Sequence, residues 1–263
     1  MRFAFGENWS KYLDNLNNER IKEAESSIKE FIGLDTLAAK KFLDIGSGSG
    51  LFSLAAKRMG ASVTSFDYDA DSVKCTQSLK DKFFPTDEDW TISEGSILDT
   101  KFVASLGKYD LVYSWGVLHH TGDMKLAFEN TSSLLKKDGI LVIAIYNTQN
   151  FFTPFWKIVK KTYIKSNSSF RKIMELFFFL YFLFILLFAD LIRLRNPLLR
   201  HKGMKQRGMS LKTDVIDWIG GWPFETAKPE EVIKFFTQKN FKLANLTTVG
   251  GKHGCNEFLF IKN

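Results

Sequence analysis

The chain has 263 residues, a formal net charge of +7 at pH 7 and 45% hydrophobic residues. This length is enough for the buried core of one α/β domain with an insertion. The two cysteines, Cys75 and Cys255, lie far apart without a C-x-x-C pair, which argues against a disulfide framework and a structural zinc site. The first residues lack the apolar core of a signal peptide, so we expect a protein of the reducing cytoplasm.

The first predicted element is an amphipathic helix over residues 19–32. Its apolar residues recur at helical spacing and are Ile21, Ala24, Ile28 and Phe31. Residues 1–38 then form a helical segment that either packs on the core or covers a ligand as a lid. In the lid arrangement, Trp9 and Tyr12 are expected to contact the ligands.

An apolar strand that begins at residue 42 runs into three glycines at alternate positions. Glycine has no Cβ, so such a turn before a helix exposes backbone N–H groups to a ligand and favours a nucleoside-type cofactor. Leu51 stands where the dinucleotide fingerprint needs its third glycine, and no Lys-Ser or Lys-Thr follows as in phosphate-binding loops. A tight turn without a ligand is the alternative. The predicted cofactor contacts are Asp44, Gly46, Ser47, Gly48 and Gly50.

Three further strands follow in chain order. Strand 62–67 ends in Asp67, about 20 residues after the first glycine, where such folds place the carboxylate that binds ribose hydroxyls. Strand 90–97 ends in the tract GSI, and strand 109–114 runs into the tract SWGVLHHTGDM.

The glycine turn and these strand ends, over residues 40–146, resemble the motifs of class I S-adenosylmethionine (SAM) methyltransferases. The resemblance implies that SAM is the cofactor and that Asp67 binds its ribose. A nucleic-acid N-methyltransferase normally carries [DNS]-P-P-[YFW] after the fourth strand, and residues 114–117 contain no proline, so we expect no nucleic-acid substrate. The further cofactor contacts implied are Tyr68, Gly95, Ser96, Ile97, Trp115, Gly116 and Val117.

The remaining elements complete an α/β fold. The resemblance implies a doubly wound, seven-stranded, Rossmann-like sheet in the order 3-2-1-4-5-7-6 with strand 7 antiparallel. Its core would comprise residues 39–149 and be completed by residues 226–263. The elements expected are helices over about 50–59, 70–82, 123–136 and 229–237, and strands over 139–146, 241–248 and 257–262.

In that topology, the loop between the last two strands lies at the edge of the sheet where open α/β folds bind ligands. The loop spans residues 250–256 and is rich in glycine. His253, Cys255 and Asn256 are therefore candidates for contact with the substrate. A glycine-rich hairpin with incidental polar residues is the alternative.

Residues 150–225 form an insertion of helical and basic character. The stretch 176–189 is apolar throughout and is closed by Glu175 and Asp190, so it is shorter than the roughly 20 residues of a membrane span. Residues 150–212 contain 13 Lys and Arg against two acids, which leaves the rest of the chain at −4. We expect a cap over an apolar acceptor or peripheral attachment to an anionic membrane, at the inner membrane surface. An interface helix of a homodimer is the alternative; the chain is then a monomer or a homodimer.

The end of the insertion, DWIGGWPFE, is typical of a tight loop that presents aromatic residues to a substrate. Together with the tracts SWGVLHHTGDM, IAIYN, RGMS and GCNEFLF, it resembles bacterial methyltransferases similar to the ubiquinone O-methyltransferases. That resemblance implies a small-molecule acceptor. The acceptor contacts predicted in the insertion are Arg207, Trp218, Trp222 and Phe224.

Two histidines after the fourth strand, His119 and His120, are the predicted catalytic residues, because methyl transfer to a hydroxyl or thiol needs a base and imidazole titrates near neutral pH. In the ubiquinone-type enzymes this tract resembles E-x-x-E-H, which can hold a metal. The matching places here are Gly116, His119 and His120, so we expect no metal. Asp123 and Tyr146 are expected to orient the base or contact the acceptor. A hydroxyl acceptor is expected first and a small thiol second, with nitrogen transfer or a silent SAM-binding protein as alternatives.

Overall fold

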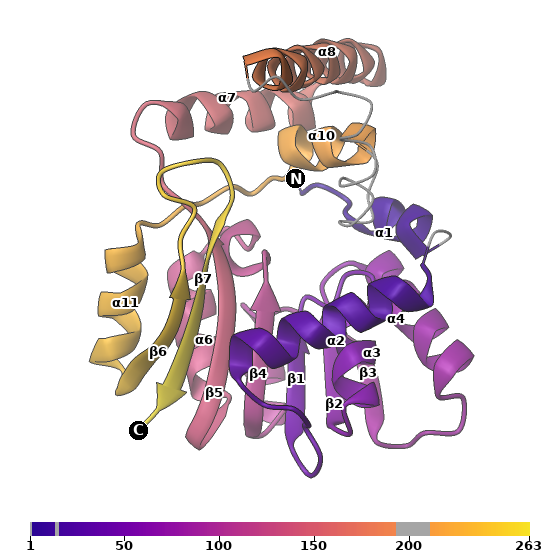
Figure 1. Cartoon of the computed structure of the whole chain (residues 1–263), viewed down its shortest axis with the longest axis vertical. Helices are drawn as coiled ribbons and strands as arrows, with labels where there is room; N and C mark the ends of the chain where they lie inside the picture. Colours follow the sequence, from indigo (N-terminus) through magenta and orange to yellow (C-terminus); the bar gives the residue numbers. More distant parts are fainter. Residues whose placement is uncertain (1, 14–15, 193–210) are drawn as a thin grey trace.

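Seven strands form one sheet in the order β3-β2-β1-β4-β5-β7-β6, in this computed structural model of the chain (Figure 1). The structure describes residues 2–13, 16–192 and 211–263. Strands β1 to β5 run parallel, and β7 pairs antiparallel with β5 and β6. The predicted sheet order is therefore confirmed. The strands are β1 (Lys41–Ile45), β2 (Ser62–Asp67), β3 (Trp90–Glu94), β4 (Tyr109–Trp115), β5 (Leu135–Tyr146), β6 (Phe241–Thr247) and β7 (Cys255–Lys262).

Helices cover both faces of the sheet and create a hydrophobic core on each. Ile21 and Leu54 are buried in one core, and Phe128 and Phe236 are buried in the other. The helices of the first face are α2 (Asn18–Ile32), α3 (Leu51–Arg58) and α4 (Ala70–Phe83); those of the second are α5 (Thr100–Ser105), α6 (Met124–Ser133) and α11 (Pro229–Gln238).

Capping residues set the ends of several helices. The Asn17 side chain accepts the Arg20 N–H at the start of α2, and Gly33 ends this helix with a left-handed φ of 77°. Asp69 caps α4 through the Asp71 N–H at 2.9 Å. The caps at Asp69 and Asp99 begin α4 and α5 soon after β2 and β3, which fixes the loops at the carboxyl ends of these two strands.

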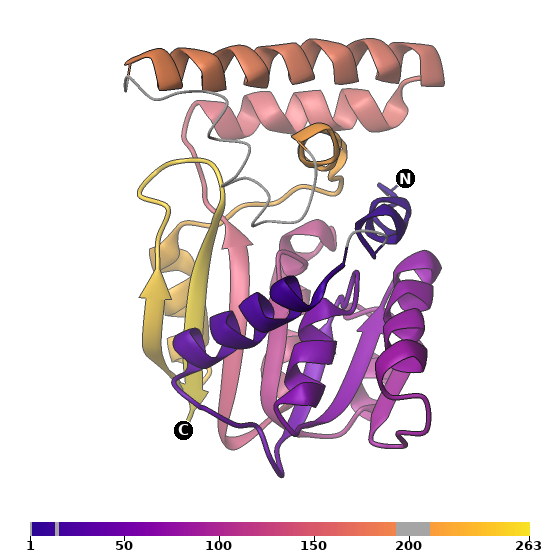
Figure 2. The same ribbon diagram turned by 45° about the vertical axis from the view of Figure 1, so that its right-hand side comes forward.

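A further layer of helices, which we call the cap, lies above the carboxyl ends of β1 to β5 (Figures 1 and 2). Its own core contains Trp156, Phe178 and Ile219. In Figure 2, α8 lies along α7 and is the helix farthest from the sheet. The cap consists of α1 (Gly6–Leu13), α7 (Phe152–Lys165), α8 (Ser168–Ile192) and α10 (Leu211–Gly220).

Helix α8 is longer and more exposed than the sequence suggests. It has 25 residues because it continues through Glu175 and Asp190, the two acids expected to bound the apolar block. Among the described residues it is the one helix long and apolar enough to cross a membrane, with a mean hydropathy of 2.3 over 18 residues. Only Phe178 and Asp190 of α8 are buried. Helices α7 and α10 pack on one side of α8, and most of the rest of α8 is exposed.

Candidate active site

The glycine turn between β1 and α3 has a backbone shape that favours glycine. Gly46, Gly48 and Gly50 have φ values of 73°, 55° and 79°, all in the left-handed region. A Cβ on Gly46 would lie 2.4 Å from the Val117 side chain, and a Cβ on Gly48 would lie 3.0 Å from the Trp9 ring. The turn therefore brings bare backbone against the loop after β4 and against the N-terminal segment.

Asp67 ends β2 beside this turn. One carboxylate oxygen accepts the Gly48 N–H at 2.9 Å, and the other accepts the Asp69 N–H at 2.9 Å. Burial raises the pKa of this carboxyl, while the two N–H donors act in the opposite direction. Each oxygen keeps a lone pair for another donor, so the carboxylate can bind two hydroxyl groups.

Asp44 and Ser47, two predicted cofactor contacts, lie beneath the turn. Asp44 is buried and accepts the Ser53 hydroxyl at 2.5 Å, and burial raises its pKa to about 7. Ser47 shares a hydrogen bond of 2.9 Å with Thr76 of α4. These two side chains hold the turn in place against α3 and α4.

The predicted contacts after β3 lie along the same edge of the sheet. Gly95 donates to the Asp67 carbonyl at 2.9 Å, which links the two strand ends. The carbonyl of Ile97 accepts the Asn130 side chain at 2.7 Å, and the Ile97 side chain is buried. Ser96 lies between them in the chain, and its hydroxyl accepts a backbone N–H at 3.2 Å.

The residues after β4 separate into two environments. The Trp115 ring stacks on Tyr113 with centroids 5.9 Å apart and on Phe52 of α3 with centroids 6.2 Å apart, in the core beneath α2. Gly116 has a φ of 76°, which redirects the chain, and Val117 then packs its side chain toward the glycine turn. Of this tract, Val117 is the side chain that reaches the cofactor candidates.

The N-terminal segment is fixed over this edge of the sheet. Arg2 donates to the His120 carbonyl at 2.8 Å, and its guanidinium lies 4.4 Å from the centre of the exposed Tyr68 ring. The Gly6 N–H donates to the Asp69 carboxylate at 3.0 Å. The segment thus joins the end of β2 to the loop after β4, as a lid would.

Trp9 and Tyr12 lie at different depths in this lid. Trp9 lies over Gly48, so it is on the cofactor side of the site. Tyr12 is buried, with its ring centroid 5.9 Å from that of Trp9, and supports Trp9 from behind.

His119 and His120 belong to a 3₁₀ turn (Leu118–His120), and their hydrogen bonds select opposite tautomers. Nδ1 of His120 lies 2.6 Å from the Pro223 carbonyl, which can only accept, so Nδ1 carries the proton and Nε2 has a free lone pair. Nδ1 of His119 accepts the Tyr146 N–H at 3.4 Å, so its proton is on Nε2. This buried Nε2 has no hydrogen-bond partner among the described residues. The pair therefore offers a proton acceptor and a proton donor side by side.

The electrostatic surroundings keep both imidazoles neutral. Burial lowers the pKa of His119 well below its usual range and lowers that of His120 to about 3. The Lys160 ammonium adds to this effect on both rings. Both imidazoles therefore hold these tautomers at physiological pH.

Aromatic side chains surround the two histidines on the side of the cap. We use the name aromatic cage for Tyr146, Trp218 and Phe224. The Tyr146 ring centroid lies 5.3 Å from that of Trp218 and 5.8 Å from that of Phe224. It also lies 4.0 Å from the His119 ring and 5.3 Å from the His120 ring. Predicted catalytic and acceptor residues from β4, β5 and the region of α10 therefore meet in one place.

Lys160 and Asp217 are buried ionisable residues at this cage to which no sequence pattern pointed, and the Lys160 Nζ lies over all three of its rings, 5.8 Å from the centre of the Tyr146 ring. Lys160 donates to the Trp218 carbonyl, and its Nζ lies 4.6 Å from the Trp218 ring and 4.8 Å from the Phe224 ring. Asp217 accepts the Asn8 side chain of α1. Burial lowers the pKa of Lys160 to about 7 and raises that of Asp217 to about 7.

Lys160 was missed because it looks like one member of a basic run. The signal that could have found it is the helical spacing of Trp156, Val159 and Tyr163, which are buried on the same stripe of α7. A lysine on that stripe must lie inside the cap, where its ammonium cannot contribute to a basic surface.

Replacing Lys160 by methionine is expected to stabilise the fold more at pH 6 than at pH 9. On folding, the pKa of Lys160 falls from 10.5 to about 7. Between these pH values the unfolded chain binds more protons than the folded chain, so the buried lysine lowers the free energy of unfolding most below pH 7. The change in unfolding free energy should differ by about 1 to 3 kcal/mol between the two pH values. Urea denaturation measures it, with Lys157→Met on the exposed side of α7 as the control. An effect independent of pH would contradict the burial of a titrating lysine.

Other predicted residues lie outside the cage. Asp123 is exposed and caps α6 by accepting a backbone N–H at 3.0 Å. Asn256 is buried and donates to the Asn147 side chain at 3.0 Å. Cys255 pairs with Tyr146 across β7 and β5, and burial raises the pKa of its thiol to about 12.

The loop before β7 and the loop after α10 border the cage. The His253 ring lies 5.3 Å from the Trp218 ring, and the Trp222 carbonyl accepts the Phe3 N–H at 3.0 Å. Arg207 lies outside the described residues. Within the described ranges, no group of three or more His, Cys, Asp or Glu side chains could hold a metal ion.

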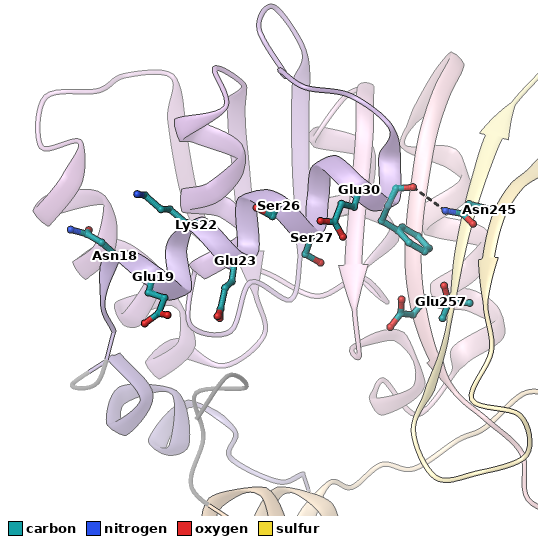
Figure 3. A pocket seen from close by; sticks show the side chains of 11 residues that line it. Asn18, Glu19, Lys22, Glu23, Ser26, Ser27, Glu30, Asn245 and Glu257 are labelled. Atoms are coloured by element: carbon teal, nitrogen blue, oxygen red, sulfur yellow. Dashed lines mark hydrogen bonds between the residues drawn. The ribbon is translucent and has the colours of Figure 1, made fainter. Parts of the chain in front are cut away.

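Two open grooves lie away from the glycine turn. One of about 880 Å³ runs between α2 and the strands β6 and β7, and its lining includes Glu19, Glu23 and Glu257 (Figure 3). A second of about 500 Å³ lies where β5 leads into α7 and includes Asn256. Neither groove contains the glycine turn or Asp67. The cofactor candidates are instead gathered beneath Trp9.

A sheet of this order with antiparallel β7, and a glycine turn facing a strand-end carboxylate, is the architecture of class I SAM-dependent methyltransferases. The comparison with known proteins agrees. A family model described as a methyltransferase domain matches residues 16–246, so the chain belongs to the methyltransferase-domain family. SAM is the cofactor of this class, as the sequence predicts.

Curated relatives carry the name ubiquinone biosynthesis O-methyltransferase. The relative from Pelagibacter ubique is 32% identical over 143 residues, which are 52% of this chain and 56% of the relative. The relative from Chelativorans sp. is 27% identical over 146 residues, with coverages of 51% and 53%. The chain spans about half the length of the curated relatives it matches.

Solved structures share the fold at low sequence identity. Magnesium protoporphyrin IX methyltransferase from Synechocystis PCC 6803, solved with bound S-adenosylhomocysteine (SAH), has a TM-score of 0.57 at 14% identity and covers 98% of this chain and 94% of its own. An O-methyltransferase family protein from Burkholderia thailandensis has a TM-score of 0.54 at 10% identity, with coverages of 92% and 57%.

Proposed function

We propose that this chain transfers the methyl group of SAM to a hydroxyl group of a small, apolar acceptor, with His120 as the general base. The observation that carries the proposal is the pair of opposite tautomers at His119 and His120. This pair places a proton acceptor beside a proton donor, next to the aromatic cage. The two histidines follow Val117, whose side chain packs on the glycine turn. The names of the curated relatives support an oxygen acceptor.

Gly46, Gly48 and Asp67 are the residues that would hold SAM. When bound, SAM supplies a methyl group on a positively charged sulfur. Two observations fit this cofactor: the turn has no side chain to hold a nucleoside away, and the Asp67 carboxylate has lone pairs left for two ribose hydroxyls. Trp9 already lies over Gly48, so its ring would move aside for the nucleoside to reach the turn.

The aromatic cage supports an apolar acceptor. Tyr146, Trp218 and Phe224 surround the Lys160 Nζ with their rings, and an apolar acceptor would take the place of this ammonium against them. Burial raises the pKa of Tyr146, so that it stays a neutral phenol. A sugar would need many hydrogen bonds in such a place, because each unpaired hydroxyl costs free energy when buried. The unpartnered Nε2–H of His119 can fix one acceptor oxygen.

His120 would take the proton of the acceptor hydroxyl at Nε2. A pKa of about 3 makes this imidazole a weak base. However, an oxygen that is gaining a methyl group holds a much more acidic proton than a free hydroxyl, so a weak base suffices late in the transfer. The Nδ1–H bond to the Pro223 carbonyl keeps the ring oriented and stabilises its protonated form.

A screen with isotope-labelled SAM tests the proposal. The full chain is mixed with phenols, quinols, sugars and small thiols of graded water solubility, and labelled products are identified by mass spectrometry. We expect transfer to hydroxyls of the least water-soluble phenols and quinols. Transfer to thiols alone would replace the oxygen acceptor by sulfur, and transfer to sugars alone would contradict the apolar cage. SAM binding without transfer to any class would leave a silent SAM-binding protein.

A further inference from the structure

We propose that α7 and α8 together dock this chain on a lipid bilayer with anionic headgroups, with α8 lying in the plane of the bilayer surface. The docking surface is the outward side of this helix pair. Large apolar side chains occupy it with exposed fractions of 49% to 68%, and they are Phe155, Ile158, Leu176, Phe177, Phe184 and Phe188.

The extent of this apolar surface separates it from the scattered apolar residues of an ordinary protein surface. It continues along the whole of α8, where only 11% of the most apolar 18 residues are buried. Water contact with such a helix is unfavourable, and the described part of the chain contributes only α7 and α10 to cover it. Within the described residues, most of α8 is therefore left uncovered for another occupant.

The charges beside the apolar residues favour an anionic lipid as that occupant. Lys157, Lys161 and Lys165 are exposed on α7, and Lys172 is exposed near the start of α8. Two acids lie on α8 against these lysines: Glu175 accepts the Tyr163 hydroxyl at 2.7 Å on the side of α7, and Asp190 is buried. Lysine side chains can extend from an apolar surface to headgroup phosphates, as membrane-surface helices require.

The packing of α8 argues that it lies in the surface and does not cross the bilayer. The Trp156 ring of α7 contacts Phe178 and Phe182 of α8, with centroids 5.6 and 6.0 Å away. Figure 2 shows α8 following α7 along its length. A spanning α8 would have to leave α7 or draw it into hydrocarbon together with its buried Lys160, and both are costly.

This placement puts the aromatic cage on the inner side of the docking surface. Trp156 and Lys160 face the cage from the same helix that exposes Phe155 and Ile158 outward. An acceptor dissolved in the bilayer would then approach the cage from the cap. This consequence rests on the proposed function, whereas the docking itself does not.

Vesicle flotation of the full chain tests the docking. We expect the chain to float with vesicles of equal parts phosphatidylglycerol and phosphatidylcholine, and at least roughly tenfold less with phosphatidylcholine alone. The variant Phe177→Ser, Phe184→Ser, Phe188→Ser should bind the anionic vesicles at least roughly 100-fold more weakly, because three exposed rings no longer insert. Leu246→Ser, at an exposed apolar position on β6, should bind as the unmodified chain does.

The charge contribution has a matched control. A triple variant of the α7 lysines should bind anionic vesicles roughly 100-fold more weakly at low salt; it carries Lys157→Gln, Lys161→Gln and Lys165→Gln. Each lysine near the membrane surface contributes about fivefold to the affinity. The control triple variant removes the same charge from exposed positions on the helices around the sheet and should change binding little; it carries Lys82→Gln, Lys101→Gln and Lys125→Gln. Equal losses in the two triple variants would contradict a local docking surface.

Three further outcomes would overturn the proposal. If the serine variant floats with anionic vesicles as the unmodified chain does, α8 does not contact the bilayer. Retention of the unmodified chain in vesicles after 1 M salt and an alkaline wash would indicate a spanning helix. If the unmodified chain is a dimer in solution and does not bind vesicles, and the serine variant is a monomer, a second copy of the chain covers the docking surface. The affinity for SAM, measured in parallel, should be the same in the serine variant as in the unmodified chain, which would show that the variant is folded. If the unmodified chain does not bind SAM, the proposed function is contradicted and the docking is not.

Discussion

Replacement of His120 by alanine is expected to lower turnover by about 10²- to 10⁴-fold at saturating SAM and acceptor. The variant loses the only one of the two imidazoles whose Nε2 is free to accept a proton. Affinity for SAM should stay within about twofold, because His120 is separated from Asp67 and the glycine turn by the loop that carries Val117. Rapid-mix product analysis gives the turnover, and titration calorimetry gives the SAM affinity.

His119→Asn is the comparison for this variant. The amide oxygen can still accept the Tyr146 N–H, while the donor at Nε2 is lost. We therefore expect its main effect on the KM for the acceptor. Added imidazole should restore part of the activity of the alanine variant of His120 and none in the asparagine variant of His119. The reverse pattern would exchange the two roles, and full activity in both variants would remove the pair from the mechanism.

The pH profile provides an independent test of His120. Because burial lowers its pKa to about 3, the imidazole is neutral throughout the range in which the protein is assayed. Turnover should therefore show no acidic inflection between pH 6 and 7 from this residue. In that range the described groups that titrate include Lys160, Asp217 and Asp44, each with a pKa of about 7. An inflection that persists in Lys160→Met and Asp217→Asn but disappears in His120→Ala would contradict the neutral pair.

Asp67→Asn is expected to weaken SAM binding by about 100-fold or more. An asparagine has one acceptor oxygen, so it can serve Gly48 or Asp69 but not both N–H groups together with a pair of ribose hydroxyls. The loss of charge-assisted hydrogen bonds, at about 1.5 to 3 kcal/mol each, gives this magnitude. Titration calorimetry with SAM measures the change.

The matched control is Asp81→Asn, which removes the same charge from an exposed position on α4. It should bind SAM as the unmodified chain does. The asparagine variant of Asp67 should also remain folded, because burial disfavours the charged carboxylate and the substitution removes that charge. Unchanged SAM affinity in a folded variant would place the ribose elsewhere.

Local sequence patterns predicted the elements of the core closely. The strand over 62–67 appears with those bounds as β2, since its alternation ends at a carboxylate and a helix cap follows. The order of the strands came from the resemblance and not from periodicity, because no local signal says which strands pair. Proline and acids at the start of α11 were likewise sufficient to predict that helix.

Sequence patterns predicted burial and helix ends less well in the insertion, where the result depends on which side of each helix faces the core. Lys160 counted as surface charge, yet it lies inside the cap, and α8 extended beyond the acids that were expected to end it. The tautomers of His119 and His120 could not be predicted, because they depend on Tyr146 and on Pro223, which is 103 residues from His120 in the chain. Trp115 remains a predicted cofactor contact; its ring packs between Tyr113 and Phe52 of α3, the helix that follows the glycine turn.

A crystal structure of the full chain grown with SAH would test the central claim most directly. We expect the nucleoside against Gly46 and Gly48, both ribose hydroxyls on the Asp67 carboxylate, and the sulfur on the side of Val117 from which His120 is reached. SAH bound elsewhere, or a folded chain whose glycine turn stays closed by Trp9 at saturating SAH, would contradict it.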